Sequence, residues 1–295
     1  MPKSSRQSVV ELALGYLREQ VAQIRDVAPR LGEDGDDIHA MRVALRRLRT
    51  TLTTCRGVFD PAITDLIRDE LRWLASELSP ARDAEVLHAH LREVLAEQED
   101  ELVLGAVRSR IDTALDREHR RAHEQIVEVR GSERYAALMV SLDAFLAAPP
   151  LGRLAGTKLD EVVPRLLRHD WKRLRRAYKR WQHASGVSAD VALHDVRKAA
   201  KRLRYAAEMA APAYGVKTTR IAEAAEAIQA SLGEQQDSVV ARQFLRRLGV
   251  QADNGFTFGR LHAFEEVRSC AARRKFEAQY AALAAPKLRR WLKKN

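Results

Sequence analysis

The amino-acid sequence predicts an all-α protein made of two helical bundles related by a pseudo-twofold axis. Its composition favours helices, because Gly (14) and Pro (9) are sparse among 295 residues and aromatic residues make up only 6%. No segment alternates with a period of two for long enough to predict a strand. A basic motif with helical spacing occurs twice, beginning at His39 and again 155 positions later at His194. Such an internal repeat indicates the architecture, because each copy builds the same unit.

Six helices are expected in the first half of the chain, joined by short connections. Proline stands at or near two of the helix starts, in Asp60-Pro61 and in Ser79-Pro80, where its missing N–H is tolerated. The helices are predicted over residues 6–28, 37–57, 61–78, 82–97, 99–130 and 133–147.

The second half follows a linker at residues 148–157. This segment contains Pro149 and Pro150, and paired prolines cannot continue a helix. The chain, 1–295, is thus expected to be one domain of two repeats, 6–147 and 158–284. The helices of the second repeat are predicted over residues 158–184, 189–213, 217–232, 235–248 and 255–284.

Matched residues outside the motif support the repeat. Asp83 corresponds to Asp237 at an offset of 154, and both follow predicted helix starts. A carboxylate there is expected to cap the helix or to orient an arginine across the bundle. The other matched pairs are Gly105 with Gly259, Arg18 with Lys172, and Arg25 with Lys179.

Each motif helix combines an apolar stripe with a row of cations. Because a helix turns by about 100° per residue, the four members of each row fall within an arc of roughly 80°. A polyanion between the two rows would offset the repulsion among so many like charges. The rows are His39, Arg42, Arg46 and Arg49, and His194, Arg197, Lys201 and Arg204. The adjoining stripes are Ile38, Met41, Leu45, Leu48 and Leu52, and Leu193, Val196, Ala200, Leu203 and Ala207.

Positive charge is concentrated in one part of the chain. The net charge is +11, and the segment from Arg165 to Arg204 holds 13 Lys or Arg against 3 Asp. This predicts an anionic partner, either nucleic acid, acidic lipid or a phosphate polymer. Charges interrupt every apolar stretch, so neither a membrane span nor a signal peptide is expected, and the predicted location is the cytoplasm. A third row, on the helix over 158–184, consists of Arg165, Arg168, Lys172, Arg175, Arg176 and Lys179, and a weaker one on the helix over 99–130 includes Arg117 and Arg121.

No motif for catalysis or metal binding accompanies these cations. His39 and His194 could be metal ligands, donors to phosphate or ordinary helix residues, and the lack of nearby Cys or carboxylate at ligand spacing argues against a metal. Cys55 and Cys270 are too few for a disulfide framework and are interpreted as small buried residues. Since phosphate-binding glycine loops, metalloprotease motifs and nucleophile elbows are absent from the sequence, we predict neither an enzyme nor a cofactor.

The two motifs resemble those of the conserved histidine α-helical domain family, known as CHAD. The likeness extends to Arg82-Asp83, although Gln236 stands where the first repeat has Arg82. The family pattern, His-x-x-Arg-x-x-x-Arg/Lys-Arg-x-Arg, occurs here as His39, Arg42, Arg46, Arg47 and Arg49, and as His194, Arg197, Lys201, Arg202 and Arg204.

The resemblance implies two pseudo-symmetric four-helix bundles, with long extra helices, around a basic central channel. It further implies inorganic polyphosphate as the ligand and, for some members, location at polyphosphate granules. Some relatives carry a triphosphate-tunnel hydrolase (CYTH) domain before the CHAD domain. Because the first CHAD helix is predicted to begin near Arg6, this chain is expected to be a stand-alone member.

The leading hypothesis is therefore a non-enzymatic module that binds polyphosphate in a basic channel. A nucleic-acid-binding protein is the main alternative, although Trp171, Tyr178 and Trp181 fall on the buried side of their helix and cannot stack bases. A metal-dependent phosphatase would need a carboxylate cluster that the sequence lacks. The candidate polyphosphate-binding residues are His39, Arg42, Arg46, Arg47, Arg49, Arg165, Arg168, Lys172, Arg175, Arg176, Lys179, His194, Arg197, Lys201, Arg202 and Arg204, with Arg18, Arg25, Arg117 and Arg121 beside them.

Overall fold

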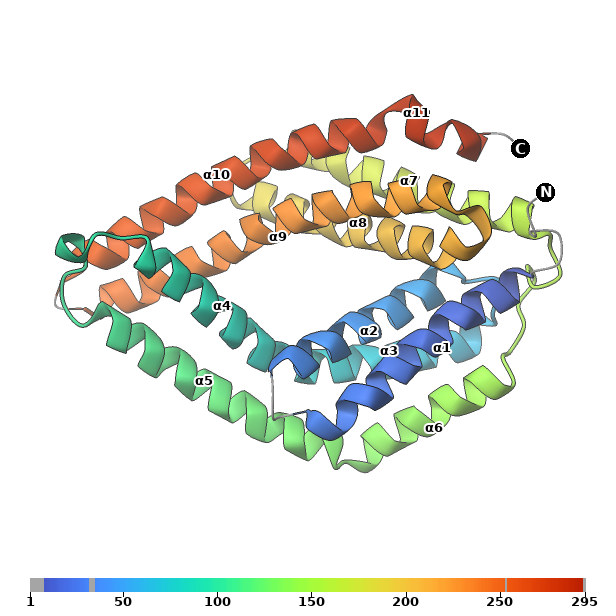
Figure 1. The fold of residues 1–295 in the computed structure, drawn as a ribbon, viewed down its shortest axis with the longest axis horizontal. Helices are drawn as coiled ribbons and strands as arrows, with labels where there is room; N and C mark the ends of the chain where they lie inside the picture. Colours follow the sequence, from blue (N-terminus) through green and yellow to red (C-terminus); the bar gives the residue numbers. More distant parts are fainter. Residues whose placement is uncertain (1–7, 32–34, 253, 294–295) are drawn as a thin grey trace.

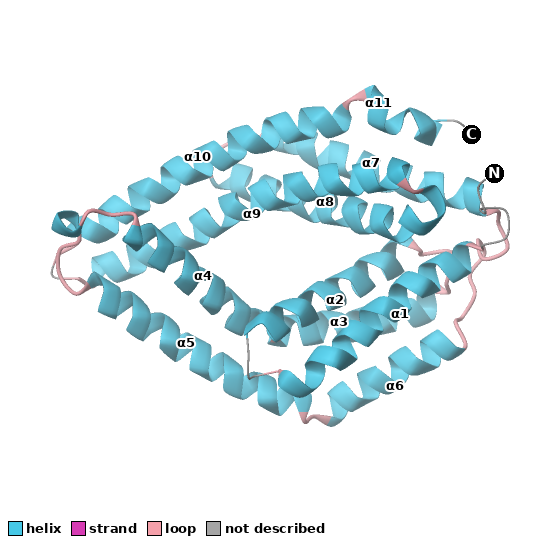
Figure 2. Cartoon of the chain, in the orientation of Figure 1, coloured by secondary structure: helices cyan, strands magenta, loops and turns pink. Residues whose placement is uncertain are grey.

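The computed structural model describes residues 8–31, 35–252 and 254–293. Within these residues the chain forms eleven α-helices and no strand, which confirms the all-α prediction (Figure 2). The helices are α1 (Val9–Val27), α2 (Gly35–Thr54), α3 (Pro61–Glu77), α4 (Ser79–Ala96), α5 (Val107–Arg130), α6 (Glu133–Ala147), α7 (Leu159–Gln182), α8 (Val187–Tyr214), α9 (Val216–Val250), α10 (Phe256–Ala284) and α11 (Pro286–Arg289).

The helices form an elongated arrangement with two long arms (Figure 1). At one end, α1, α2, α3 and α6 lie on one side and α7 and α8 on the other. From there α4 with α5, and α9 with α10, extend as two helix pairs that meet at the opposite end. The two sides are joined where α2 packs against α8, so the two motif helices are neighbours in space.

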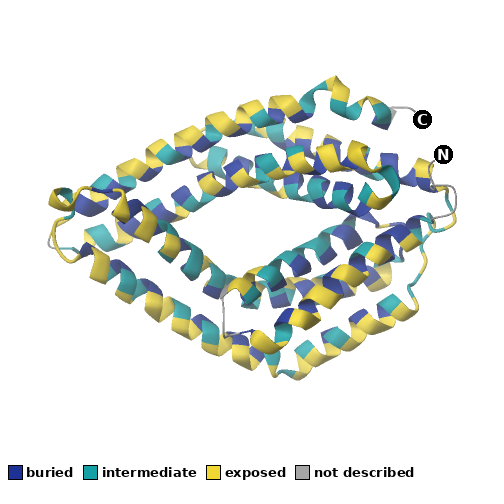
Figure 3. Cartoon of the chain, viewed as in Figure 1, coloured by how far each residue is buried: buried dark blue, intermediate teal, exposed yellow. Residues whose placement is uncertain are grey.

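Two hydrophobic cores hold the ends of the molecule. The larger one is built from α1, α2, α3, α6, α7, α8 and the first half of α9, together with the C-terminal ends of α5 and α10. The smaller one joins the distal halves of the arms through residues such as Leu91, Ile111, Phe244 and Leu261. Buried positions run as stripes along the helices in Figure 3, as expected for amphipathic helices. The motif helices belong to the larger core, which holds them in a fixed position.

Local sequence explains several helix boundaries. Ser8 and Glu11 form a capping box at the start of α1, each side chain accepting the other's backbone N–H at 3.1 and 2.8 Å. Asp60 caps α3 by accepting a backbone N–H two residues later at 2.9 Å. Gly215 separates α8 from α9 with φ of +55°, a conformation that favours glycine.

Two of the predicted helices, 217–232 and 235–248, are wrong as separate elements. They form one continuous helix, α9, with Gly233 in its interior. A lone glycine lowers helix propensity by only about 1 kcal/mol, which packing along both sides of α9 outweighs. In the first half, by contrast, Pro80 follows the junction between α3 and α4, where a proline ends the preceding helix.

Other boundaries shift by less. The predicted helix over 99–130 begins only at Val107, because a short 3₁₀ turn and Gly105, with φ of +79°, precede it. The predicted start at Arg6 lies outside the described residues. Cys55 is buried as predicted, whereas Cys270 is exposed and corrects that interpretation.

The linker at residues 148–157 is non-helical and attached to the turn after α2. The Asp60 N–H donates to the Pro150 carbonyl at 2.9 Å, and the Gly152 N–H donates to the Val58 carbonyl at 2.8 Å. A Cβ at Gly152 would lie 2.6 Å from the Gly57 carbonyl oxygen, so this close approach requires glycine. The linker is thus a defined part of the larger core region, while the division into two repeats stays a prediction from the sequence.

Candidate functional site

The motif helices bury their apolar stripes as predicted and turn part of each cationic row toward a shared space. Each residue of both stripes is 2% exposed or less, so the orientation of α2 and α8 is fixed by core packing. The buried residues are Ile38, Met41, Leu45, Leu48 and Leu52 on α2, and Leu193, Val196, Ala200, Leu203 and Ala207 on α8.

A cavity of about 690 Å³ lies between α2, α3, α7 and α8, and we name it the motif cavity. Its lining contains nine Lys or Arg side chains and a single carboxylate, Asp195. Asp195 itself forms ion pairs with Lys198 at 2.7 Å and with Arg180 at 3.7 Å. The cavity therefore carries a large excess of positive charge. Its basic residues are Arg42, Arg46, Arg49, Arg68, Arg173, Arg180, His194, Lys198, Lys201 and Arg202.

Four of these cations have no carboxylate within 4 Å in the part of the chain that the structure describes. They are Arg46, Arg49, Arg173 and Lys201. Burial, followed by repulsion from Arg197, Arg46 and Arg42, lowers the pKa of Lys201 to about 7. A group this perturbed costs free energy in the empty protein, and a bound anion would relieve that cost.

Acidic residues of the two arms lie near two motif arginines, Arg42 and Arg197. Arg42 contacts Asp83 of α4 at 3.4 Å, which supports the prediction that Asp83 orients an arginine. Asp237 lies in the middle of α9 and cannot cap a helix start, which corrects that alternative. Burial raises the pKa of Asp237 despite the opposing charge of Arg197.

Arg197 packs closely on the backbone of α9. Its Nε donates to the Gln229 carbonyl at 3.4 Å, and a Cβ added at Gly233 would lie 3.1 Å from its Nη2. Gly233 thus allows the guanidinium to lie against the helix, which explains a glycine inside α9.

Two motif arginines are neutralised on the side of α8 away from the cavity. Glu208 contacts Arg204 at 2.6 Å and Arg47 at 3.3 Å, and accepts a hydrogen bond from the Tyr16 hydroxyl at 2.7 Å. Arg204 also contacts Glu226 at 3.0 Å. Arg47 and Arg204 do not line the motif cavity, and their contacts join α1, α2, α8 and α9.

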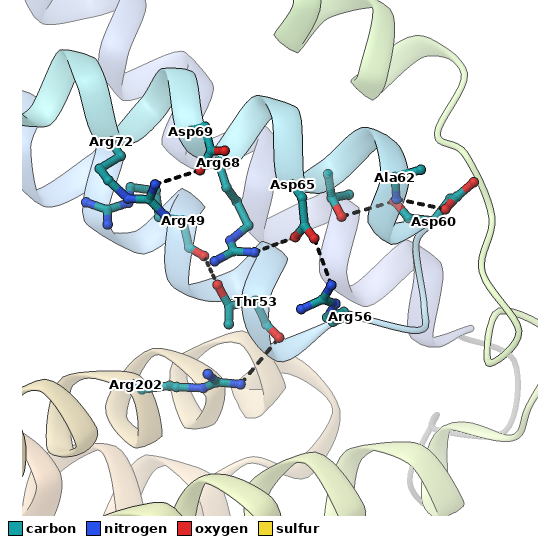
Figure 4. Close-up of polar contacts among 11 residues, drawn as sticks. Arg49, Thr53, Arg56, Asp60, Ala62, Asp65, Arg68, Asp69, Arg72 and Arg202 are labelled. Carbon is teal, nitrogen blue, oxygen red and sulfur yellow. Dashed lines mark hydrogen bonds and ion pairs between the residues drawn. The ribbon is translucent and has the colours of Figure 1, made fainter.

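Arg202 has a mixed role. Its Nε lies 2.5 Å from the buried carboxylate of Asp170, which also accepts a hydrogen bond from Thr54 at 3.0 Å. Its Nη2 donates to the Thr53 carbonyl at 3.3 Å, as Figure 4 shows. Arg202 therefore ties α8 to α7 and α2 while still lining the cavity.

The predicted cationic row on α7 is turned away from the motif cavity, which corrects its expected placement. Lys172, Arg175, Arg176 and Lys179 are exposed outside it, and the Arg168 Nε donates to the Pro164 carbonyl at 3.2 Å. The side of α7 that faces the cavity carries Arg173 and Arg180 instead. Arg165 lines a neighbouring cavity between α3, α7 and the linker.

The four first-half candidates outside the motif are also dispersed. Arg25 forms an ion pair with Asp143 of α6, and Arg18 and Arg117 are exposed. Arg121 lines a different cavity of about 570 Å³ between α4, α5 and α9. None of the four lines the motif cavity.

The two motif histidines occupy different positions. His194 lines the motif cavity, whereas His39 stands beside it near Arg82, Arg46 and Arg42. Burial and the neighbouring cations lower the pKa of both histidines, so the empty protein favours the neutral imidazole.

Neither a metal-binding cluster nor a membrane-spanning helix occurs among the described residues. Among residues 8–31, 35–252 and 254–293, His, Cys, Asp and Glu nowhere gather in groups of three that could hold a metal ion. No described helix combines the length and apolar character needed to cross a bilayer.

Other proteins are similar to this chain in sequence and in fold. The CHAD domain family model matches residues 15–246. Two uncharacterized proteins of Mycobacterium tuberculosis, from different strains, are each 34% identical over 252 residues, covering 82% of this chain and 47% of the relative. The chain thus spans about half the length of these curated relatives.

Two solved structures have the same fold. PptA from Streptomyces chartreusis superposes with a TM-score of 0.76 at 21% identity, covering 93% of this chain and 100% of PptA. The CHAD domain from the plant Ricinus communis gives 0.71 at 25% identity, covering 97% and 94%. Because the CHAD domain family model matches most of its length, the chain belongs to the CHAD domain family.

Proposed function

We propose that this protein binds inorganic polyphosphate in the motif cavity and acts by binding rather than by catalysis. The observation that carries the proposal is the charge of the cavity, nine Lys or Arg side chains against one carboxylate that is already paired. Arginine suits phosphate, because its planar fork donates two parallel hydrogen bonds to phosphate oxygens.

The arrangement of the cations favours a chain of phosphates over a single ion. Arg42, Arg46 and Arg49 follow one another along α2, with a rise of about 1.5 Å per residue. Lys198, Lys201 and Arg202 follow one another along α8 on the facing wall. Successive phosphates of one chain can contact successive cations, and linked contacts raise affinity through effective concentration.

Nucleic acid is the second candidate, and the lining of the cavity disfavours it. Among the described residues that line the motif cavity there is no Phe, Tyr or Trp on which a base could stack. A hydrolase is disfavoured because Asp195, the carboxylate in the lining, is held by Lys198 and Arg180 instead of being available to Mg²⁺. We propose in addition that binding of this kind brings the protein to polyphosphate granules.

Titration calorimetry with size-fractionated polyphosphate tests the proposed function. We expect affinity to rise with chain length and to fall steeply with salt, because many counterions are released together. Orthophosphate should bind weakly, and single-stranded DNA should displace long polyphosphate only at large excess. Equal affinity for short and long chains would contradict the cavity proposal, and equal competition by DNA would favour the nucleic-acid alternative.

A further inference from the structure

A second cavity of about 660 Å³ adjoins the motif cavity, and we name it the linker cavity. It lies between α3, the first half of α7 and the linker that precedes α7. Its polar and charged lining consists of Thr53, Thr54, Arg56, Arg68, Arg153, Arg165, His169, Asp170, Arg173 and Arg202.

The two cavities are neighbours in a defined direction. They share four residues, Thr53, Arg68, Arg173 and Arg202. Along α2 and the turn after it, the lining runs from Arg42 in the motif cavity to Arg56 in the linker cavity. Along α7 it runs in the reverse chain direction, from Arg180 to Arg165. The two cavities thus lie end to end along α2 and α7, and three of the four residues that they share are arginines.

The linker cavity also carries excess positive charge. Its lining contains six arginines and one carboxylate, Asp170, which is 1% exposed and held by Arg202 and Thr54. Asp65 of α3, which does not line the cavity, contacts Arg68 at 2.5 Å and Arg56 at 2.8 Å, as Figure 4 shows.

Arg153 and Arg165 line the linker cavity alone, and neither is paired with Asp65 or Asp170. Neither has a carboxylate within 4 Å among the described residues. Arg153 is positioned by the linker, because the preceding Gly152 is hydrogen-bonded to Val58. Two unneutralised guanidinium groups are thereby held over one cavity, next to Arg173, which also has no carboxylate partner within that distance in the described chain.

We propose that the linker cavity is a second phosphate subsite, which takes the continuation of the polyphosphate chain held in the motif cavity. This inference rests on the proposed function. The chain passes Arg68, Arg173 and Arg202, and its end is held by Arg153 and Arg165. Because the cavities have similar volumes, 690 and 660 Å³, a chain that fills both is about twice as long as one that fills the motif cavity alone. The protein therefore selects longer chains.

The test compares two double variants of the full chain, each of which removes two positive charges from α7 or from the linker that precedes it. Arg153→Ala with Arg165→Ala removes the two cations of the linker cavity that have no carboxylate partner among the described residues and do not line the motif cavity. Lys172→Ala with Arg176→Ala removes two exposed cations of α7 that line neither cavity. All four side chains are exposed, so both variants should keep the helical circular dichroism and melting temperature of the wild type. Affinities for inorganic tripolyphosphate and for long-chain polyphosphate are measured at one ionic strength.

We expect the Arg153/Arg165 variant to lose about tenfold or more in affinity for the long chain, since two charge-assisted contacts are removed. Its tightest binding of tripolyphosphate, in the motif cavity, should change by less than about twofold, and the Lys172/Arg176 variant should bind the long chain almost as the wild type does.

Three results would overturn the linker subsite while leaving polyphosphate binding intact. These are an unchanged affinity of the Arg153/Arg165 variant for the long chain, a loss equal to that of the Lys172/Arg176 variant, and a loss of the same size for tripolyphosphate. Failure of the wild type to bind long-chain polyphosphate would instead overturn the proposed function itself.

Discussion

The Nε of Arg46 donates a 2.9 Å hydrogen bond to the hydroxyl of Tyr205, so α2 and α8 share a polar contact beside the motif cavity. Tyr205 is 1% exposed, and its ring also lies 5.7 Å from the guanidinium carbons of Arg47 and Arg204. A buried phenol thus fixes the direction of a cation that has no carboxylate partner within 4 Å among the described residues.

Removing that hydroxyl should weaken both the fold and the ligand site, each by a small amount. Tyr205→Phe deletes one hydrogen bond worth about 1 kcal/mol, which lowers the melting temperature by roughly 2–4 °C. Polyphosphate affinity should fall by about threefold, because Arg46 then loses orientation before it binds. Thermal denaturation and calorimetry on the same preparation measure both effects, and a gain in affinity would show that Tyr205 competes with the ligand for Arg46.

Lys201 should make the stability of the empty protein depend on pH. Its pKa is about 7 in the folded protein and about 10.4 in an unfolded chain. Between these values the unfolded chain binds a proton that the folded protein lacks, so the free energy of unfolding rises with pH. Lys201→Met should remove this contribution, and urea denaturation from pH 7 to about 9 should show the wild type gaining stability relative to the variant. Parallel curves for the two proteins would contradict the low pKa.

Polyphosphate affinity should depend on pH in the opposite direction. A bound anion favours the ammonium form of Lys201 and the protonated forms of His39 and His194, whose pKa values are all lowered in the empty protein. Binding near neutral pH should therefore take up protons, and affinity should fall as the pH rises. Calorimetry in buffers of different ionisation enthalpy measures the uptake directly. It should be smaller in Lys201→Met, and the absence of uptake in the wild type would place these groups outside the site.

Glu208 should be important for stability and dispensable for binding. Glu208→Gln removes the charge that holds Arg47 and Arg204, so we expect a loss of about 2–3 kcal/mol in the free energy of unfolding. Polyphosphate affinity should not decrease, because neither arginine lines the motif cavity. Chemical denaturation and polyphosphate titration separate the two effects. A large loss of affinity in a stable variant would instead assign Arg47 and Arg204 to the ligand.

Periodicity in the sequence predicts the orientation of the motif helices but not that of α7. On α2 and α8 one apolar stripe lies beside one row of cations, so burying the stripe leaves a single direction for the row. On α7 cations occupy most of the surface outside the apolar stripe, and periodicity cannot tell which of them face a cavity. The row predicted from spacing is turned away, while Arg173 and Arg180, which lie outside that row, line the motif cavity.

Tertiary partners explain the other differences. Arg47 and Arg204 fit the family pattern, yet Glu208 forms ion pairs with both and Glu226 with Arg204, and these contacts depend on how α1, α2, α8 and α9 pack. Arg68 and Arg153 have no motif around them and enter the cavities because α3 and the linker pack beside α2. The continuity of α9 likewise depends on packing, because the glycine at position 233 is compatible with either a break or a helix.

The most direct test of the motif cavity is the affinity of the double variant Arg46→Glu with Lys201→Glu for long-chain polyphosphate. Lys172→Glu with Arg176→Glu is the matched control, because it reverses the same number of charges on α7 outside the cavity. The motif variant should lose roughly 100-fold or more in affinity, since charge-assisted contacts become repulsive, while the control stays within about threefold of the wild type. Helical circular dichroism should be retained, because neither residue belongs to an apolar stripe and relief of repulsion opposes the loss of the Arg46–Tyr205 hydrogen bond, which is worth about 1 kcal/mol. Equal affinities of the two variants, or loss of helicity in the motif variant, would contradict binding in the motif cavity.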